Sequence, residues 1–283
     1  MNTSSLLSII IVSYNSQKIL TQCLAPLIES GEYPIIIIDN ASPDGSADTL
    51  KSRFPRAKTI ALKQNIGYGR AANLGLEAVE TPYALLINPD LIANTEAVQG
   101  LLTHALNDDT QTAIWGPASK KEDHGEIPPQ PVNWISGCAM LFEMSKLRKI
   151  GYFDESIFLF FEETDLCRRA NASGFTIKQC NDIYFDHLLG EASTPSPAIE
   201  QLKNWHYGWS SSYFHVKHKL ISKKTNPKRR LFTYRRKSIF NLNSISRKKY
   251  NNRANGIRAF LRGEQAFDSR GKPVGAVKMD KHI

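Results

Sequence analysis

Short aliphatic runs alternate with helical patterns from residue 7 to residue 87, and this alternation constrains the fold more than any other feature. The sequence predicts strands at 7–13, 35–39, 58–62 and 83–87, and helices at 17–29, 46–54 and 69–79. Strands that alternate with helices indicate βαβ units. We therefore predict an α/β fold, with a Rossmann-like, mixed but mostly parallel sheet flanked by helices.

Two of the predicted strands end in carboxylate-bearing segments. Asp39-Asn40-Ala41-Ser42 follows one apolar run, and Asn88-Pro89-Asp90 follows another. Ligands of open α/β sheets bind beyond the carboxyl ends of the strands. Asp39 could accept a hydrogen bond from a base or ribose, and Asp90 could bind a cation on a diphosphate. Taken singly, each also fits an ordinary turn or helix cap.

Two further polar segments occupy the same predicted edge of the sheet. Ser13, Tyr14 and Asn15 end the first strand, where they could line a nucleobase pocket or only cap the next helix. The segment 65–73 contains two glycines at a helix start, where free backbone amides favour phosphate. Arg70 within it could pair with a diphosphate or with solvent. The glycine pattern alone is also common in loops.

The middle of the chain adds a second acidic cluster. Glu162, Glu163 and Asp165 open a predicted helix at 163–173, where they could supply a general base or only a charged first turn. Asp165 and Arg169 are spaced for a surface pair. Asp186-His187 ends a strand candidate, so His187 could bind a metal or be an ordinary loop residue. The other elements expected here are a helix at 95–107, a loop at 120–131, and strands at 113–115, 133–143, 175–180 and 183–185.

Composition describes an ordinary globular chain of 283 residues, of which 41% are hydrophobic and 22% charged. No stretch approaches the roughly 20 apolar residues of a membrane-spanning helix. The apolar run 6–12 has no basic residue before it, so a signal peptide is not expected. Four cysteines show no paired spacing, which predicts reduced thiols and a cytoplasmic protein.

Charge is divided unevenly along the chain. Residues 201–283 contain 21 Lys and Arg but 3 Asp and Glu, a net charge of +18, whereas residues 1–200 carry a net charge of −9. We expect a catalytic domain at 1–220 and a basic helical extension at 221–283. Apolar residues at helical spacing in 202–220 form one face, which either packs on the core or lies on a bilayer. The basic clusters after 223 suit an anionic membrane surface, and oligomeric state is left open.

In their order along residues 7–215, these motifs resemble the family-2 glycosyltransferases, which have the A-type glycosyltransferase fold. The subgroup that is most similar is the rhamnosyltransferase-like enzymes of bacterial surface-polysaccharide synthesis, which often carry Asn-Pro-Asp where relatives have Asp-x-Asp. The matching series is Ile11-Val12-Ser13-Tyr14-Asn15, Asp39-Asn40-Ala41-Ser42, Asn65-Ile66-Gly67-Tyr68 with Asn73, Asn88-Pro89-Asp90, Ser136-Gly137-Cys138-Ala139, Phe161-Glu162-Glu163-Thr164-Asp165-Leu166 and His187.

The resemblance implies roles for the matching positions and their neighbours. Glu163 stands where the family has its catalytic base, but relatives often have Asp there, so Glu162 stays open as the alternative. Asp90 and His187 would hold a divalent cation, Mg²⁺ or Mn²⁺. The acceptor would meet Trp134, Ser136, Gly137 and Asp165. The donor would be bound by Ser13, Tyr14, Asn15, Asp39, Asn40, Asn65, Gly67, Arg70, Asn73, Asn88 and Asp90.

The function that the resemblance implies is inverting transfer of a sugar from a nucleoside-diphosphate sugar, with dTDP-L-rhamnose first, to a saccharide or lipid-linked saccharide. A UDP-sugar donor is the nearest alternative. A sugar-phosphate nucleotidyltransferase would need a Gly-rich basic loop where Ser13-Tyr14-Asn15-Ser16 stands. A nucleic-acid-binding protein would explain only the basic tail, so no nucleic-acid partner is expected. We expect Asp39, Asp90, Glu163 and His187 to converge.

Overall fold

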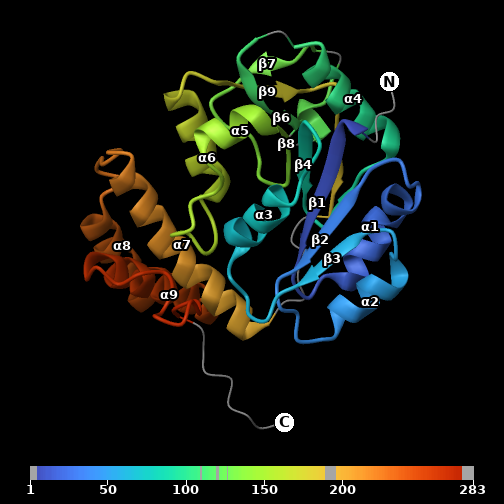
Figure 1. The fold of residues 1–283 in the computed structure, drawn as a ribbon. Helices are drawn as coiled ribbons and strands as arrows, with labels where there is room; N and C mark the ends of the chain where they lie inside the picture. The colour runs from blue at the N-terminus through green and yellow to red at the C-terminus, as the bar shows by residue number, and fades with distance from the viewer. Residues whose placement is uncertain (1–4, 109, 119–120, 126, 189–195, 276–283) are drawn as a thin grey trace. The chain divides into compact units, whose positions relative to one another are not determined.

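The computed structural model describes residues 5–108, 110–118, 121–125, 127–188 and 196–275. The chain divides into two compact units (Figure 1). The sheet unit comprises Met1–Asp154 and Glu162–Thr194, and the helical unit comprises Glu155–Phe161 and Pro195–Ile283. These compact units divide before the expected functional boundary at 220/221, because the helix at 197–217 belongs to the helical unit. That functional boundary stays a prediction.

The sheet unit alternates strands and helices as the sequence predicts. Its elements are β1 (Leu7–Ser13), α1 (Gln17–Glu29), β2 (Ile35–Asp39), α2 (Ser46–Arg53), β3 (Lys58–Ala61), α3 (Tyr68–Glu77), β4 (Tyr83–Ile87), β5 (Leu91–Ile92), α4 (Thr95–Leu106), β6 (Thr112–Pro117), the 3-10 turn Lys121–Asp123, β7 (Gln130–Pro131), β8 (Ala139–Glu143), α5 (Met144–Ile150), α6 (Glu162–Ala172), β9 (Thr176–Cys180) and β10 (Asp186–His187).

One mixed sheet carries the site. Its strand order is β3-β2-β1-β4-β8-β6-β9-β7, and a separate two-stranded sheet pairs β10 with β5. Strands β3, β2, β1 and β4 are parallel, whereas β8 runs antiparallel to both β4 and β6. The carboxyl ends of β1, β2 and β4 therefore lie at one edge of the sheet, where ligands of such folds bind.

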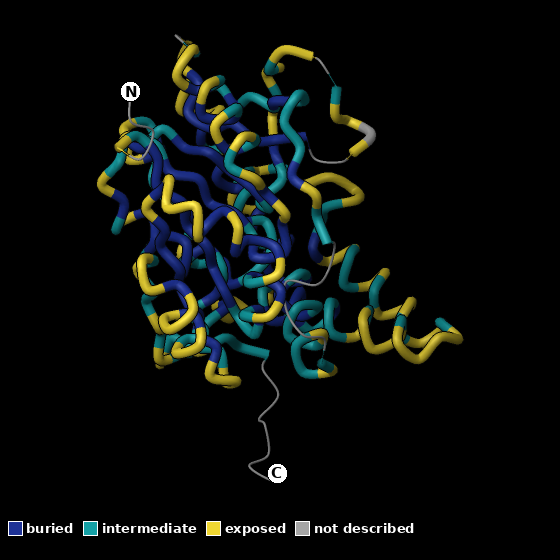
Figure 2. Tube along the Cα trace, turned by 90° about the vertical axis from the view of Figure 1, so that its right-hand side faces the viewer, coloured by how far each residue is buried: buried dark blue, intermediate teal, exposed yellow. Residues whose placement is uncertain are grey.

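Helices cover both faces of this sheet because the residues of each strand alternate between them. Leu7, Ile9 and Ile11 of β1 join the apolar cluster that contains α1, α2 and α4. Ile10 and Val12 join the opposite cluster, which contains α3, α5 and α6. The central strands β1, β2, β4, β6 and β8 are mostly buried, whereas β3 and β7 at the two ends of the sheet are more exposed; the buried parts of the chain are dark blue in Figure 2. The predicted fold class, a mostly parallel α/β sheet flanked by helices, is confirmed.

Some predicted elements differ from the structure. The strand expected at 133–143 begins only at Ala139, because Ser136, Gly137 and Cys138 form a turn before it. The strand expected at 183–185 is wrong, since the paired residues are the next two, Asp186 and His187. Helix α5 was not expected, because its seven residues follow β8 directly, without a polar break.

The helical unit consists of α7 (Pro197–Lys217), α8 (Pro227–Phe240), α9 (Ser244–Leu261) and the segment Glu155–Phe161. Trp205 and Trp209 of α7 are buried in a cluster with Phe158, Ala259 and Ala266. Gly208 and Gly256 let the backbones of α7 and α9 approach closely, since a Cβ on either would overlap the other helix's backbone. The apolar face predicted at 202–220 is therefore largely interior packing.

Among the described residues, the helices are all too short or too polar to span a membrane. The four cysteines are free thiols, of which Cys23, Cys167 and Cys180 are buried.

Candidate active site

The ends of β1 and β2 place Ser13 and Asp39 side by side, as partners in the parallel register. Both are buried. Asp39 accepts hydrogen bonds from the backbone N–H of Ser42 at 3.0 Å and from its hydroxyl at 2.6 Å. The Ser42 hydroxyl oxygen in turn accepts the Asn15 backbone N–H at 2.9 Å. This network ties the loop after β2 to the loop after β1, so it fixes the shape of this edge.

Asn15 is held in a left-handed backbone conformation, with φ of +53°. Asparagine tolerates this region better than most residues. Its side-chain oxygen Oδ1 is buried and has no hydrogen-bond partner among the described residues. Buried acceptors usually find a donor, so an orphan at a strand end indicates a ligand group that would supply one.

Asn40 and Asn65 shape the loop before α3. The Asn40 amide donates to Asn65 Oδ1 at 3.1 Å and to the Gly67 carbonyl at 3.2 Å, while its own Oδ1 accepts the Ile66 N–H at 2.9 Å. Asn65 Oδ1 also accepts the Gly67 N–H at 3.0 Å. These amides are occupied by the loop itself. Their expected part in donor binding would therefore be indirect, through loop shape.

Asn73 makes a paired contact with a residue 80 positions away. Its amide donates to the Phe153 carbonyl at 2.9 Å, and its Oδ1 accepts the Phe153 N–H at 3.0 Å. Phe153 also packs over Gly69, where a Cβ would stand 3.1 Å from the Phe153 Cβ. Asn73 thus anchors the segment that follows α5 onto α3, which is a structural task that the sequence did not reveal.

The Tyr68 hydroxyl lies close to two of the segments that carry predicted site residues. Its hydroxyl lies 3.1 Å from Asn88 Oδ1 and 3.3 Å from the Gly137 carbonyl, and can donate to either. Its pKa is raised well above 10, first by burial and then by the charges of Glu162, Glu163 and Asp90. Sequence reasoning quoted Tyr68 within a motif but assigned it no role. Tyrosine after Gly67 at a helix start was the available signal.

Glu162 and Glu163 begin α6 in different surroundings. Glu162 is only 3% exposed, and one of its oxygens has no partner among the described residues. Burial, together with the charge of Glu163, raises the pKa of Glu162 to about 8. Glu163 is partly exposed and lies against Gly137, where a Cβ would stand 3.2 Å from its Cβ and Cγ. Glu162 is therefore a protonated, buried acid at neutral pH, and the adjacent Glu163 is the more accessible of the two side chains.

Asp90 and His187 come together through the small sheet of β5 and β10, in which His187 pairs with Leu91. Asp90 is 1% exposed, and its Oδ2 lies 3.3 Å from His187 Nε2. Its other oxygen, Oδ1, is buried without a partner among the described residues. An uncompensated carboxylate oxygen of this kind is costly unless a cation or a donor meets it.

The pair fits a divalent cation. Adjacent ligands of an octahedral ion with bonds of about 2.1 Å stand about 3 Å apart, close to the separation of the Asp90 and His187 atoms. In the described part of the chain, no third His, Cys, Asp or Glu joins them. Such a site would leave most positions of the cation to phosphate oxygens and water, as cations on diphosphates require.

The expected acceptor residues are divided. Trp134 is 44% exposed, and Ser136 and Gly137 follow it on the turn that faces Glu163. Asp165 is instead fully buried and pairs with Arg169 Nε at 2.7 Å. Arg169 holds the carbonyls of Ile150 and Gly151 at 2.9 and 2.8 Å. The expected surface pair is therefore an interior ion pair that fixes the end of α5, and the structure gives no support to acceptor contact by Asp165.

Arg70, which the sequence predicts to bind the donor, is partly buried in the first turn of α3.

Backbone strain concentrates beside these motifs. Among the described residues, five non-glycine positions have positive φ, and four of them flank candidate segments: Asn15, Ala41, Phe160 and Phe161. Phe160 and Phe161, at +69° and +73°, directly precede Glu162 and Glu163. Such conformations cost stability and persist where surrounding structure imposes them, often at functional sites.

Of the four side chains expected to converge, Asp90 and His187 lie side by side, and Glu163 lies against Gly137, whose carbonyl is 3.3 Å from the Tyr68 hydroxyl. Asp39 stands on β2 at the same edge of the sheet, with β1 between β2 and β4. The sequence thus located the edge, and the structure adds Tyr68 at its centre.

Known proteins resemble this chain in sequence and in fold. N-acetylglucosaminyl-diphospho-decaprenol L-rhamnosyltransferase of Mycobacterium tuberculosis is 24% identical over 222 residues, 61% of this chain and 72% of that protein. The Pyrobaculum calidifontis mannosyltransferase PcManGT, solved with GDP-Man and Mn²⁺, superposes with a TM-score of 0.60 at 10% identity, covering 90% of this chain and 86% of its own. Staphylococcus aureus TarS 1-349, solved with UDP-GlcNAc, gives 0.56 at 15% identity over 92% of both chains.

The family match is independent of these pairwise similarities. The model of glycosyl transferase family 2 matches residues 8–168, which include β1, the Asp39 and Asp90 segments and the start of α6. This agrees with the resemblance predicted from the motifs and removes the nucleotidyltransferase alternative. The match covers more than half of the chain, and this protein therefore belongs to glycosyl transferase family 2.

Proposed function

We propose that this enzyme is an inverting glycosyltransferase that moves a hexose from a nucleoside-diphosphate sugar to a saccharide or lipid-linked saccharide acceptor. The first candidate donor is dTDP-L-rhamnose, because a relative over 61% of the chain is named an L-rhamnosyltransferase. The observation that carries the proposal is geometric: the Tyr68 hydroxyl lies within hydrogen-bond distance of Asn88, two residues before Asp90, and of the Gly137 carbonyl, and Gly137 lies against Glu163. One accessible carboxylate beside a candidate cation site suits a single displacement.

In that displacement, the oxygen of an acceptor hydroxyl attacks the anomeric carbon, and Glu163 accepts the proton of that hydroxyl. The new bond joins acceptor oxygen to anomeric carbon, and the bond between that carbon and the phosphate oxygen breaks. The electron pair leaves with the nucleoside diphosphate. Partial exposure of Glu163, and its position against Gly137, favour it over Glu162 as the base.

Glu162 has a different task in this proposal. Because its pKa is about 8, it carries its proton at neutral pH and cannot accept a second one. A neutral Glu162 limits the negative charge near Glu163 and near an incoming diphosphate. The Tyr68 hydroxyl lies within hydrogen-bond distance of both Asn88 Oδ1 and the Gly137 carbonyl, and it can donate to one of them at a time. It therefore links the Asn-Pro-Asp turn to the turn that contains Gly137.

Donor binding falls to the strand ends. Ser13, Asn15 and Asp39 would meet the nucleoside, with the orphan Asn15 Oδ1 as an acceptor for a base or ribose donor. Asp90 and His187 would hold Mg²⁺ or Mn²⁺. When bound, the cation supplies charge neutralisation for the leaving diphosphate. The imidazole favours Mn²⁺ over Mg²⁺.

Donor identity is tested by thermal shift with dTDP-rhamnose, UDP-sugars and GDP-sugars, each with and without Mn²⁺. A ligand that binds only the folded state raises the melting temperature. The donor that does so is then incubated with an N-acetylglucosaminyl-diphospho-lipid, and the product's anomeric configuration is determined. Retention of configuration would overturn single displacement, and stabilisation by a UDP-sugar alone would overturn the rhamnose assignment.

The UDP-sugar alternative has its own support. TarS 1-349, which shares the fold over 92% of the chain, was solved with UDP-GlcNAc, whereas PcManGT was solved with GDP-Man. The shared fold therefore accommodates different nucleotides. The same thermal-shift series decides between a rhamnosyl donor and galactosyl, glucosyl or N-acetylhexosaminyl donors.

A further inference from the structure

The helical unit contains a long stretch without acidic residues. Residues 201–263 hold 17 Lys and Arg and no Asp or Glu. Helices α8 and α9 lie entirely within this stretch. Two adjacent helices whose own charged residues are all basic attract an anionic partner.

One face of α8 is engaged with α9. Tyr234 stacks on Tyr250 with ring centroids 5.7 Å apart, and the Lys237 ammonium lies 5.1 Å from the Tyr250 ring centroid. Arg230 lies over the Tyr234 ring at 5.6 Å. These residues recur at helical spacing, so they define the inner face of α8.

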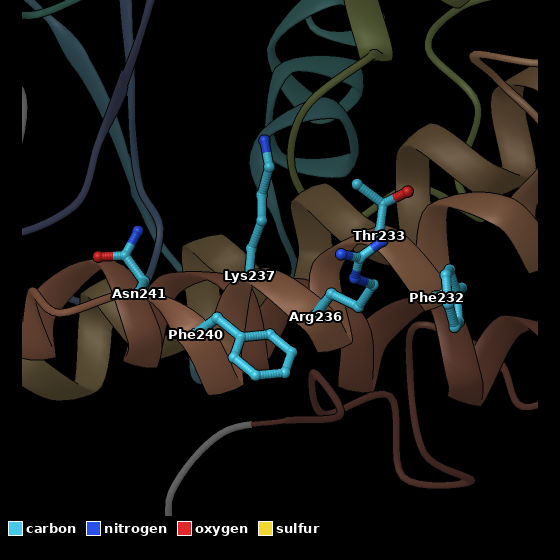
Figure 3. A pocket seen from close by; sticks show the side chains of 6 residues that line it. All are labelled: Phe232, Thr233, Arg236, Lys237, Phe240 and Asn241. Atoms are coloured by element: carbon cyan, nitrogen blue, oxygen red, sulfur yellow. The ribbon is translucent and has the colours of Figure 1, made fainter.

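The outer face of α8 is apolar and exposed. Phe232 is 64% exposed, Ile239 67% and Phe240 74%. Arg236 lies between the two phenylalanines on the same stripe, and its guanidinium stands 5.8 Å from the Phe232 ring centroid. A hollow of about 410 Å³ is lined by Phe232, Arg236, Phe240 and their neighbours. Figure 3 shows the six side chains that line it, which come from α8 and from the residue after that helix. The hollow contains none of the candidate active-site residues.

The turn from α8 to α9 continues this apolar surface. Leu242 is 99% exposed, and Ile245 in the first turn of α9 is 76% exposed. Arg247, Lys248 and Lys249 follow within α9 and are exposed. Aliphatic side chains left this open on a folded helical hairpin, beside basic residues, form an amphipathic surface.

We propose that this surface, made of Phe232, Ile239, Phe240, Leu242 and Ile245 with the surrounding basic residues, binds an anionic lipid bilayer. The apolar side chains enter the boundary between headgroups and acyl chains, and the Lys and Arg side chains meet lipid phosphates. A nucleic acid would use the cations and the aromatic rings but would leave Ile239, Leu242 and Ile245 exposed to water. The aliphatic residues therefore favour the bilayer.

The inference does not depend on the donor or on the catalytic base. It bears on the proposed function in one respect, because bilayer attachment would bring the enzyme to acceptors that are anchored in lipid. The test uses vesicle binding without substrate, so its failure and a failure of the proposed transfer reaction can be told apart.

The experiment is flotation of the purified full-length protein with vesicles of phosphatidylcholine alone or mixed with phosphatidylglycerol, over a series of salt concentrations. The apolar variant is Phe240→Ser/Leu242→Ser, and the charge variant is Arg235→Ser/Arg236→Ser. The matched control is Leu106→Ser/Ile127→Ser, which removes two exposed aliphatic residues, 46% and 49% exposed, from the sheet unit. Circular dichroism checks that each variant retains its helices.

The expected result is salt-sensitive flotation of the wild type and the control with the anionic vesicles alone. Both hairpin variants should bind them about 10-fold or more weakly, because each loses one of the two contributions to interfacial binding. Equal binding by the apolar variant and the wild type would overturn the proposal. So would tight binding to a single-stranded oligonucleotide without vesicle binding, which would identify a polyanion site instead.

Discussion

The two units differ in the kind of polar group that they bury. The sheet unit buries Asp90 and Glu162, each with an oxygen that has no partner among the described residues. The helical unit keeps its Lys and Arg at the surface or partly exposed, and its interior is aromatic and closely packed. Uncompensated groups reduce stability, and three of those among the described residues, on Asn15, Asp90 and Glu162, belong to the candidate site, which indicates that this edge is organised for chemistry. The helical unit instead exposes basic and apolar side chains on α8 and α9.

The variant with the largest expected effect is Glu163→Gln, which tests the chemical role of the sheet unit. If Glu163 is the base, the amide cannot take the acceptor proton, and kcat should fall by about 10²- to 10⁴-fold. Donor affinity and melting temperature should stay near those of the wild type, because Glu163 is partly exposed. Steady-state kinetics and calorimetric donor titration measure the two effects separately.

Glu162→Gln is the matched control for that variant. Glu162 is already protonated at neutral pH, since its pKa is about 8, so an amide is a close substitute. We expect a loss within about 10-fold, which is less than the roughly 10²-fold or more that a proton-transfer group contributes. A larger loss in Glu162→Gln than in Glu163→Gln would reverse the assignment of the base.

Sequence patterns predicted this edge of the sheet well, for a physical reason. β1, β2 and β4 are buried on both faces, so they are nearly continuous aliphatic runs whose last residue marks the edge. Asp39 and Asp90 follow two of these runs, and their strands flank β1. Strand pairing therefore brought together residues that lie about fifty positions apart in the sequence.

Local sequence patterns do not reveal contacts in which a side chain serves a partner far along the chain. Asn73 forms hydrogen bonds with the backbone of Phe153. Asp165 accepts a hydrogen bond from Arg169, which also donates to the carbonyl of Ile150 at the end of α5. Nothing in local spacing distinguishes such an anchor from a ligand contact. Tyr68 was not assigned a role for the same reason, since its hydrogen-bond partners Asn88 and Gly137 lie 20 and 69 positions further along the chain.

The second prediction concerns the helical unit's interior. Gly256→Ala places a methyl group on the Trp205 carbonyl of α7, so the two helices must separate. Although alanine favours helices over glycine, overpacking should lower the free energy of unfolding by about 1–3 kcal/mol. Thermal and urea denaturation measure this. Asn251→Ala, at an exposed position of the same helix, should be close to neutral. If both variants were equally stable, the close approach of α7 and α9 at Gly256 would not contribute to the stability of the helical unit.

The third prediction separates function from stability at the cation site. Asp90→Asn replaces a buried carboxylate, whose Oδ1 has no partner among the described residues, by a neutral amide of the same size, so the melting temperature should hold or rise. Mn²⁺-dependent donor affinity should nevertheless fall by about 10-fold or more, because a neutral amide is a weaker ligand for a hard cation. Calorimetry with and without Mn²⁺ checks this. Unchanged Mn²⁺ dependence would remove Asp90 from the cation site.

The fourth prediction follows from the pKa of Glu162. Folding raises this pKa from 4.5 to about 8, so between these values the folded protein holds a proton that the unfolded chain has released. The contribution to stability is therefore present below pH 4.5 and is lost as pH rises toward 8. Melting curves across this interval should show the wild type losing at least about 1 kcal/mol relative to Glu162→Gln. Parallel pH profiles would contradict the burial of a neutral acid.

The smallest predicted effect tests the exception to the contrast, His206 in the interior of the helical unit. The ring is fully buried at 4.3 Å from Phe158, and neither nitrogen has a hydrogen-bond partner among the described residues. Burial lowers its pKa from 6.5 to about 3, so the unfolded chain binds a proton more readily, and stability falls as pH drops through this interval. His206→Phe should stabilise the protein by about 1 kcal/mol and flatten its acid unfolding, because it removes an unpaired polar group. If transfer activity stays unchanged, the interior of the helical unit is structural throughout. A loss of activity with raised stability would mean that this unit, too, contains a group kept for function, and the contrast between the units would fail.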